Sequence, residues 1–312
     1  MEPLRIIFMG TPQFAVPSLN KLYEAGYQIA GVVTAPDKPA GRGMQLTESA
    51  VKKYAVDKNL KILQPEKLKD PGFIKELREL NADLQVVVAF RMLPEIVWNM
   101  PPKGTINVHA SLLPQYRGAA PINWAIINGE EETGVTIFKL QHEIDTGNIL
   151  LQEKIRIEPD ETAGTLHDKM METGAELLLE TIKQLENGTL KEMAQPSLFL
   201  NHDSPLNHAP KLFTETCEID WNKNVEDIYN LIRGLSPYPT AFTFLNGKKL
   251  KIYLSEIEKI TPGNEPGKIS TDNKTFLKFS ASDGIISLKE IQLEGKKRMK
   301  IEDFLRGWRQ NN

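Results

Sequence analysis

The chain has 312 residues, of which 40% are hydrophobic and 25% are charged, and its formal net charge is -3. This length can bury at least one sizeable core and favours two domains. No apolar stretch reaches the roughly 18 residues that a membrane helix needs, and the single cysteine, Cys217, excludes an internal disulfide and a paired-cysteine metal site.

The N-terminal segment MEPLRIIFMG has one positive charge and a short apolar run, so it is typical of a first strand and not of a secretion signal. We therefore expect a cytoplasmic protein that does not bind membranes. The sequence shows no heptad pattern and no obvious apolar patch, so a monomer is the expected oligomeric state.

Apolar runs and amphipathic segments alternate through the first half. Strands are expected at residues 4–10, 27–34, 83–90, 104–110 and 133–141, and helices at 14–26, 71–80 and 162–188. The valine and isoleucine runs are continuous instead of alternating with polar residues, which is typical of parallel strands buried on both faces. The pattern predicts a Rossmann-like α/β domain with a mainly parallel sheet over residues 1–190.

Residues 191–208 are rich in proline, asparagine and histidine and are expected to form an extended linker. A helix at 225–235 follows, and then short apolar strands joined by Asn246–Gly247 and Asp283–Gly284, two strong hairpin signals. These features predict a small antiparallel β-barrel, OB-like, over 209–312. From residue 208 onward, 17 Lys and Arg face 14 Asp and Glu, a net of +3, so any polyanion contact is expected to involve this half.

The first strand runs into the turn MGTPQFAVPSL. It contains Gly10 but no G-x-G-x-x-G pattern, which argues against NAD or FAD binding. Thr11 is able to cap the next helix. Two readings stay open at this point: a simple strand–helix turn, or a turn that lines a pocket.

The loop PDKPAGRGMQ lengthens a connection that is usually short, and such loops are often used for binding. Arg42 lies between two glycines in this loop. Its guanidinium is suited to bind a phosphate through two hydrogen bonds or to stack on a base. A solvated surface charge is an equally weighted alternative to these binding roles.

The segment INVHASLLPQYRGAAP places Asn107 and His109 at the end of an expected strand. A spacing of two puts both side chains on one face, and strand ends are where α/β sheets bind ligands. An amide and an imidazole together are able to polarise a carbonyl and move a proton. A structural histidine is the alternative. Ser111 to Pro114 are expected to form a turn that exposes backbone groups.

The segment KLQHEIDTGNIL contains Asp145 in a D-T-G triplet between two strands. Aspartic proteases need two such aspartates, and this chain has one copy in an α/β context. A carboxylate beside a sheet end suits a partner for His109, and a plain turn residue is the alternative. The sequence has no zinc ligand set, Walker A loop or G-x-S-x-G elbow. Direct transfer with acid–base help is therefore favoured over a covalent intermediate.

Taken together, NVHASLLPQYRGAAP and DTGNIL resemble the signature of the folate-dependent formyltransferases. The resemblance covers nearly the whole chain. The PAGRG insertion and the later IDW…IRGLSPYP are similar to the branch of that superfamily that acts on initiator tRNA.

The resemblance implies that the methionyl amine of initiator Met-tRNA attacks the formyl carbon of 10-formyltetrahydrofolate, with no metal. Asn107 would stabilise the oxyanion, His109 would transfer a proton, and Asp145 would orient His109 and help to deprotonate the amine.

Folate and tRNA residues follow from the same resemblance. The folate site would use Phe90, Met92, Leu93, Ser111, Leu112, Leu113 and Pro114. Gly10 and Thr11 would border the cleft, the loop carrying Arg42 would enter the acceptor stem, and the C-terminal barrel would bind tRNA. The chain departs from the family in one place, with Phe90–Arg91 where Tyr-Gly is usual.

Two other functions remain as alternatives. The first is a small-molecule amine formyltransferase or a formyltetrahydrofolate hydrolase of the same superfamily. The second, from another class, is a non-catalytic RNA-binding protein. An oriented acid–base set at Asn107, His109 and Asp145 argues against the second, because binding alone does not require one.

Overall fold

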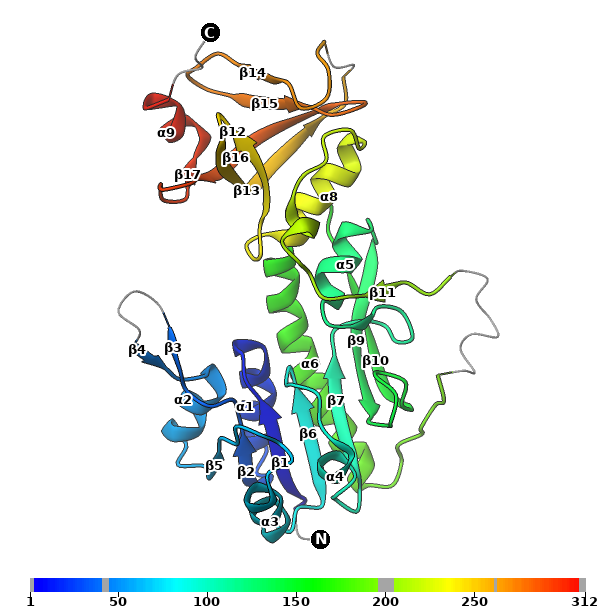
Figure 1. Cartoon of the computed structure of the whole chain (residues 1–312). Coiled ribbons are helices and arrows are strands. Elements are labelled where there is room, and N and C mark those ends of the chain that lie inside the picture. Colours follow the sequence, from blue (N-terminus) through cyan, green and yellow to red (C-terminus); the bar gives the residue numbers. More distant parts are fainter. Residues whose placement is uncertain (1–2, 41–44, 196–204, 261–262, 309–312) are drawn as a thin grey trace. The chain divides into compact units, whose positions relative to one another are not determined.

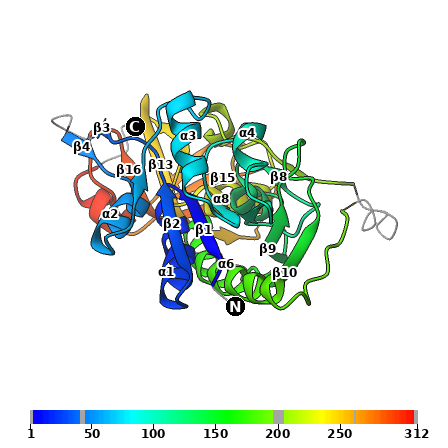
Figure 2. The same ribbon diagram turned by 90° about the horizontal axis from the view of Figure 1, so that it is seen from below.

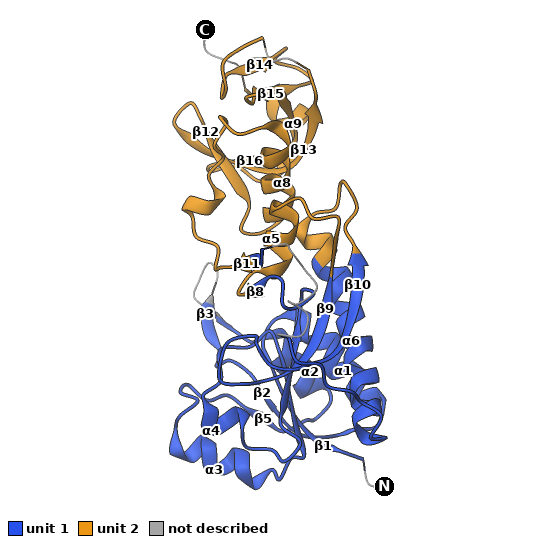
Figure 3. Cartoon of the chain, turned by 90° about the vertical axis from the view of Figure 1, so that its right-hand side faces the viewer, with its two compact units in different colours: residues 1–117, 134–155, 167–207 blue, residues 118–133, 156–166, 208–312 orange. Residues whose placement is uncertain are grey.

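A computed structural model describes residues 3–40, 45–195, 205–260 and 263–308 of the chain (Figure 1). The chain divides into two compact units that interleave along the sequence (Figure 3). Unit 1 comprises residues 1–117, 134–155 and 167–207, and unit 2 comprises 118–133, 156–166 and 208–312. The sequence suggests one boundary in a linker at 191–208, whereas by packing two earlier segments also belong with unit 2.

Unit 1 is built on a seven-stranded sheet with the strand order β10-β9-β7-β6-β1-β2-β5. Its strands are β1 (Arg5–Gly10), β2 (Gln28–Val33), β5 (Ile62–Leu63), β6 (Leu84–Val88), β7 (Thr105–His109), β9 (Glu132–Lys139) and β10 (Ile149–Arg156). The neighbouring pairs β5–β2, β2–β1, β1–β6 and β6–β7 are parallel, and β9 runs antiparallel to β7. All five residues of β6 are buried. The expected mainly parallel, two-sided sheet is confirmed.

Helices cover both faces of this sheet. They are α1 (Val16–Glu24), α2 (Ala50–Asp57), α3 (Pro71–Glu79), α4 (Glu95–Trp98) and α6 (Ala163–Glu186). Figure 2 shows α1 and α6 on one face and α3 and α4 on the other. The face toward α3 and α4 buries Ile7, Val87, Leu77 and Val97 in one apolar cluster. On the opposite face a Cβ at Gly174 of α6 would lie 3.1 Å from Val108, so α6 packs closely on β7.

Local signals set the limits of these helices. Asp70 caps α3 by accepting a hydrogen bond from the amide of Phe73 at 2.9 Å, and Pro71 occupies the first turn. Gly26 ends the α1 region with a φ of 82°. The expected cap by Thr11 is wrong: a 3-10 turn, η1 (Gln13–Ala15), precedes α1, and Pro12 is its N-cap without a side-chain bond.

Unit 2 carries an antiparallel sheet with the order β12-β13-β16-β15-β14, and β17 pairs with β16. Its elements are α5 (Pro121–Ile127), β11 (His208–Ala209), η2 (Glu215–Cys217), α8 (Val225–Leu235), β12 (Ala241–Leu245), β13 (Lys248–Glu258), β14 (Ile269–Thr271), β15 (Leu277–Ser280), β16 (Ile285–Leu293), β17 (Met299–Lys300) and α9 (Ile301–Arg306). The sheet curls over a core in which Trp221 stacks on Phe279 with 4.5 Å between ring centroids. The expected small barrel-like antiparallel domain is confirmed.

Two short paired strands, β3 (Lys38–Ala40) and β4 (Gln45–Thr47), form a hairpin in unit 1, and β8 (Arg117–Gly118) lies at the unit boundary. In the part of the chain that the structure describes, no helix is both long and apolar enough to cross a lipid bilayer.

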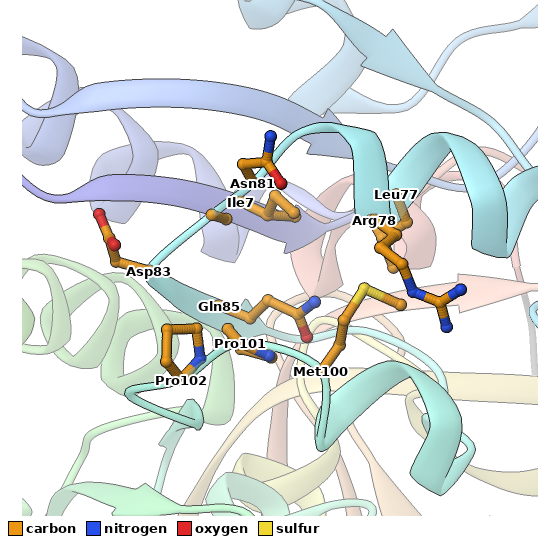
Figure 4. Close-up of a pocket in the computed structure, with 10 residues that line it drawn as sticks. Ile7, Leu77, Arg78, Asn81, Asp83, Gln85, Met100, Pro101 and Pro102 are labelled. Atoms are coloured by element: carbon orange, nitrogen blue, oxygen red, sulfur yellow. The ribbon is translucent and has the colours of Figure 1, made fainter.

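A pocket of about 260 Å³ opens at the amino ends of β1 and β6, away from the strand ends that carry Asn107 and His109. Figure 4 shows the amide of Gln85 directed into it. Gln85 is fully buried, and its Nε2 makes no hydrogen bond with any described residue. The Thr105 hydroxyl, 3.0 Å from Gln85 Oε1, also lies 2.6 Å from the Trp98 carbonyl. Because a hydroxyl has one proton, one end of the amide stays unpaired whichever way it is turned.

We therefore expect Gln85→Met to raise the free energy of unfolding by about 1 kcal/mol, because it removes a buried polar group without a partner. Gln152 is the matched control, since its amide donates to the Leu113 carbonyl at 2.8 Å and to Thr136 Oγ1 at 2.9 Å. Gln152→Met should lower stability by about 1–3 kcal/mol. Urea unfolding measures both changes. A loss of stability in Gln85→Met would show that solvent or a small molecule satisfies the Gln85 amide.

Candidate active site

Asn107 and His109 end β7, the strand between β6 and β9. The register pairs Gly10 of β1 with Val88 of β6, and Val88 with Val108 of β7, so these three strands end at one level. Val108 faces α6, and the alternation of side chains along a strand places Asn107 and His109 together on the opposite face. The expected pairing of these two side chains is therefore present at the carboxyl edge of the sheet.

His109 is held in one orientation by the backbone of the loop that follows it. The ring is 6% exposed, and its Nε2 lies 2.9 Å from the carbonyl oxygen of Tyr116. A carbonyl only accepts hydrogen bonds, so Nε2 carries a proton and donates it. In the neutral imidazole Nδ1 is then the basic nitrogen.

The Nδ1 atom of His109 faces Asp145, with 3.9 Å between Nδ1 and Asp145 Oδ2. This distance allows electrostatic interaction but is too long for a hydrogen bond. The ring is thus fixed by Tyr116, whereas the resemblance gave that orienting task to Asp145. A proton that arrives at Nδ1 would therefore lie between the imidazole ring and the Asp145 carboxylate.

Asn107 is half-buried, and its side-chain amide makes no hydrogen bond with residues 3–40, 45–195, 205–260 or 263–308. The amide can therefore donate to a ligand without breaking an internal bond. An unengaged amide beside an acid–base histidine is suited to stabilise negative charge on an oxygen.

The loop after β7 is braced from within. The Ser111 hydroxyl donates to the Gln115 carbonyl at 2.6 Å, and the Thr136 hydroxyl donates to the Ser111 carbonyl at 2.6 Å. The Leu113 amide donates to Thr136 Oγ1 at 3.1 Å, and Leu113 is buried. Of the four expected folate residues in this loop, Ser111 and Leu113 are buried, and Leu112 and Pro114 are half-exposed.

The turn that carries Asp145 is tightly packed. Asp145 has a φ of 55°, a left-handed conformation that aspartate tolerates better than most residues. A Cβ at Gly147 would lie 1.6 Å from the Lys139 carbonyl oxygen, so only glycine fits there. The side chains of Asn148 and Lys139 bind Glu192 and hold the pKa of its carboxyl below the usual range. This anchor is formed above the ordinary carboxyl pKa and is lost as the pH falls through the lowered value.

Residues 90–93 begin where β6 ends, after Ala89 with a φ of 47°. The guanidinium of Arg91 donates to the carbonyls of Pro65 and Glu66 and lies 5.6 Å from the ring centroid of Phe90. Met92 is 74% exposed, whereas Leu93 is buried in the core of unit 1. The departure at Phe90–Arg91 is thus accommodated by local hydrogen bonds of the arginine.

Gly10 ends β1 under steric restraint, because a Cβ there would lie 2.7 Å from the Ala15 Cβ. Thr11 is half-buried beside it. Arg42 lies outside the described residues. No group of three or more His, Cys, Asp or Glu side chains among the described residues is arranged to hold a metal ion.

Three contributors to this geometry carry no motif signal of their own: the Tyr116 carbonyl, the Thr136 hydroxyl and Gln195. Gln195 is buried and hydrogen-bonded to Arg117, whose pKa is lowered by burial and raised in part by the carboxylates of Asp145 and Glu143. Tyr116 and Arg117 lie within the motif NVHASLLPQYRGAAP, but the motif does not show which groups they contact.

Comparison with known proteins identifies the family. Residues 4–182 match the formyl transferase family model, and residues 211–309 match the model of the formyl transferase C-terminal domain. The chain is 56% identical over 314 residues to methionyl-tRNA formyltransferase of Phocaeicola vulgatus. The aligned region covers 99% of this chain and 97% of that protein. It is 52% identical over 313 residues to methionyl-tRNA formyltransferase of Bacteroides thetaiotaomicron, with the same two coverages.

Solved structures share the fold at lower identity. An N-formyltransferase from Helicobacter canadensis, in complex with folinic acid and dTDP-3-aminofucose, matches with a TM-score of 0.69 at 20% identity. That match covers 95% of this chain and 100% of the other. With two matched family models and relatives above half identity over nearly their full length, the chain belongs to the methionyl-tRNA formyltransferase family of formyl transferases.

Proposed function

We propose that the protein transfers the formyl group of 10-formyltetrahydrofolate to the amino group of initiator methionyl-tRNA, giving the formylated tRNA that initiates translation. The observation that carries this proposal is the arrangement of His109 between the Tyr116 carbonyl and Asp145, with an unengaged amide at Asn107 beside it. Family membership supplies the substrate class.

The reaction forms a bond between the methionyl nitrogen and the formyl carbon and breaks the bond from that carbon to N10 of the folate. Asn107 donates a hydrogen bond to the oxygen that becomes negative in the tetrahedral intermediate. His109 accepts the amine proton at Nδ1, and Asp145 stabilises the imidazolium that results. The proton is then delivered to N10 as the folate leaves, so His109 and Asp145 end as they began.

The folate is proposed to bind beside this group, between residues 90–93 and the 111–114 turn. The half-exposed side chains of Leu112 and Pro114 offer apolar contact, and the backbone that follows β6 offers polar groups to the pterin. Ser111 is proposed to act by bracing the turn, because its hydroxyl is already engaged with Gln115.

The tRNA is proposed to contact the loop that carries Arg42 and the basic surface of unit 2. A groove of about 390 Å³ in unit 2 is lined by Lys249, Lys251, Gln292, Leu293 and Glu294. The Nζ of Lys249 lies 3.9 Å from the ring centroid of Phe242. Arg298 is a weaker candidate for phosphate contact, because it already pairs with Glu290 at 2.5 Å.

The function is tested by supplying 10-formyltetrahydrofolate with initiator methionyl-tRNA, elongator methionyl-tRNA or free methionine, and measuring formyl-methionine formed. We expect formyl transfer to the initiator substrate alone. Transfer to a free amine of similar rate would favour the small-molecule formyltransferase alternative. Binding of tRNA without any transfer would favour the RNA-binding alternative.

A further inference from the structure

We propose that Arg117 and Gln195 are positioning residues that hold the Asp145 turn in place against His109. Neither residue is expected to touch the substrates. The inference rests on the proposed function, because it assigns these residues a task in the same proton transfer.

Gln195 links two segments of unit 1 that are far apart in sequence. Its Oε1 accepts hydrogen bonds from Arg117 Nε at 3.1 Å and Arg117 Nη2 at 2.5 Å. Its Nε2 donates to the carbonyls of Asp145 at 2.9 Å and Gly147 at 2.8 Å. A guanidinium only donates and a carbonyl only accepts, so the partners fix the orientation of this amide. Gln195 is 0% exposed, which keeps water from replacing these bonds.

The hydrogen bonds of Gln195 hold the backbone of Asp145, the residue whose carboxylate faces His109. Asp145 has a left-handed φ of 55°, and Gln195 binds its carbonyl directly. The close approach of Gly147 to the Lys139 carbonyl fixes the other side of the turn. A turn clamped on both sides keeps the Asp145 carboxylate at 3.9 Å from His109 Nδ1.

Two consecutive residues therefore position both members of the acid–base pair. The Tyr116 carbonyl holds His109 at Nε2, and Arg117, through Gln195, holds the backbone of Asp145. The Tyr116 segment is itself anchored, because the Tyr116 amide donates to the Asn207 carbonyl at 2.7 Å. The burial that lowers the pKa of Arg117 is consistent with this internal role.

The test compares Gln195→Leu, Gln195→Glu and Arg117→Lys with the wild type, measuring kcat and the KM for each substrate. Gln195→Leu should lower kcat by about 100-fold, the typical effect of misplacing a catalytic group by about 1 Å, with little change in KM. Gln195→Glu keeps the acceptor for Arg117 but loses both donors, and Arg117→Lys keeps one donor. Gln195→Glu should therefore be at least as slow as Gln195→Leu, because its carboxylate faces the carbonyls of Asp145 and Gly147 and has no donor for them. Arg117→Lys should lose less activity than Gln195→Leu. Gln184→Leu is the control, since Gln184 is a surface residue of α6 bound to Glu180.

A double mutant separates this role from general loss of structure. In an Asp145→Asn background, Gln195→Leu should cause almost no further loss of kcat, because both changes act on one group. Equal losses in the two backgrounds, or an unchanged kcat in folded Gln195→Leu, would overturn the inference.

A readout without substrate keeps this result apart from the proposed function. The ring nitrogen signals of His109, followed by NMR in isotope-labelled protein, should shift in Gln195→Leu and not in Gln184→Leu. Unchanged signals in Gln195→Leu would overturn the positioning role. Absence of formyl transfer by the wild type would instead overturn the proposed function.

Discussion

His109→Gln is expected to lower kcat by about 10²–10⁴-fold, the usual contribution of a general base. The Nε2 of a glutamine side chain occupies nearly the position of the imidazole Nε2, so it keeps a donor for the Tyr116 carbonyl, which His109 Nε2 meets at 2.9 Å. It has no atom that accepts the amine proton at the Nδ1 position. The loss should therefore appear in kcat, while thermal unfolding stays close to that of the wild type.

His109→Asn is the matched variant, because its amide reaches the Nδ1 position but not the Tyr116 carbonyl. Both variants lack a base, so both should be slow, and His109→Asn should also be less stable. Steady-state kinetics and melting curves measure the two effects separately. A folded His109→Gln enzyme with near-wild-type kcat would contradict the assignment of His109 as the base.

The strands and helices that follow regular sequence patterns were predictable. Three consecutive valines mark β6, and the Asn246–Gly247 turn, with φ values of 50° and 75°, defines the first hairpin of unit 2. In these places local propensity and burial agree, so a single sequence carries enough information. The short strands β3, β4, β5 and β14 have two or three residues each and are too brief for any period to show.

The positions of the candidate site residues in the fold were predictable for a similar reason. Asn107 and His109 belong to one strand, and the period of two fixes their shared face. Predicting the position of Asp145 required one further assumption. The strand before it, β9, had to lie next to β7, so that the turn after β9 came close to the end of β7.

The residues that hold this group in place were not predictable. Gln195 meets Arg117 across 78 positions and Asp145 across 50 positions of sequence. The Tyr116 carbonyl is a backbone atom, which any residue type at that position would supply. Contacts of this kind depend on the final packing of loops and leave no period or motif in a single sequence.

Asp145→Asn is expected to lower kcat by about 10³-fold. The charge of Asp145 lies 3.9 Å from His109 Nδ1, and its side chain is 14% exposed. Two opposite charges about 4 Å apart interact by about 4 kcal/mol at an effective dielectric constant of about 20, which corresponds to about three factors of ten in rate. The interaction exists only when His109 has taken up the amine proton, so it lowers the barrier without strengthening substrate binding.

Asparagine preserves the backbone conformation of the turn. It tolerates the left-handed φ of 55° as well as aspartate does, and its carbonyl still accepts the hydrogen bond from Gln195. The variant should therefore fold normally and bind both substrates with unchanged KM. Asp145→Ala also removes the carboxylate, and it should be at least as slow as Asp145→Asn because alanine adopts the left-handed φ less readily. A large rise in the KM for tRNA at constant kcat would mean that Asp145 binds substrate instead of stabilising the charged imidazole.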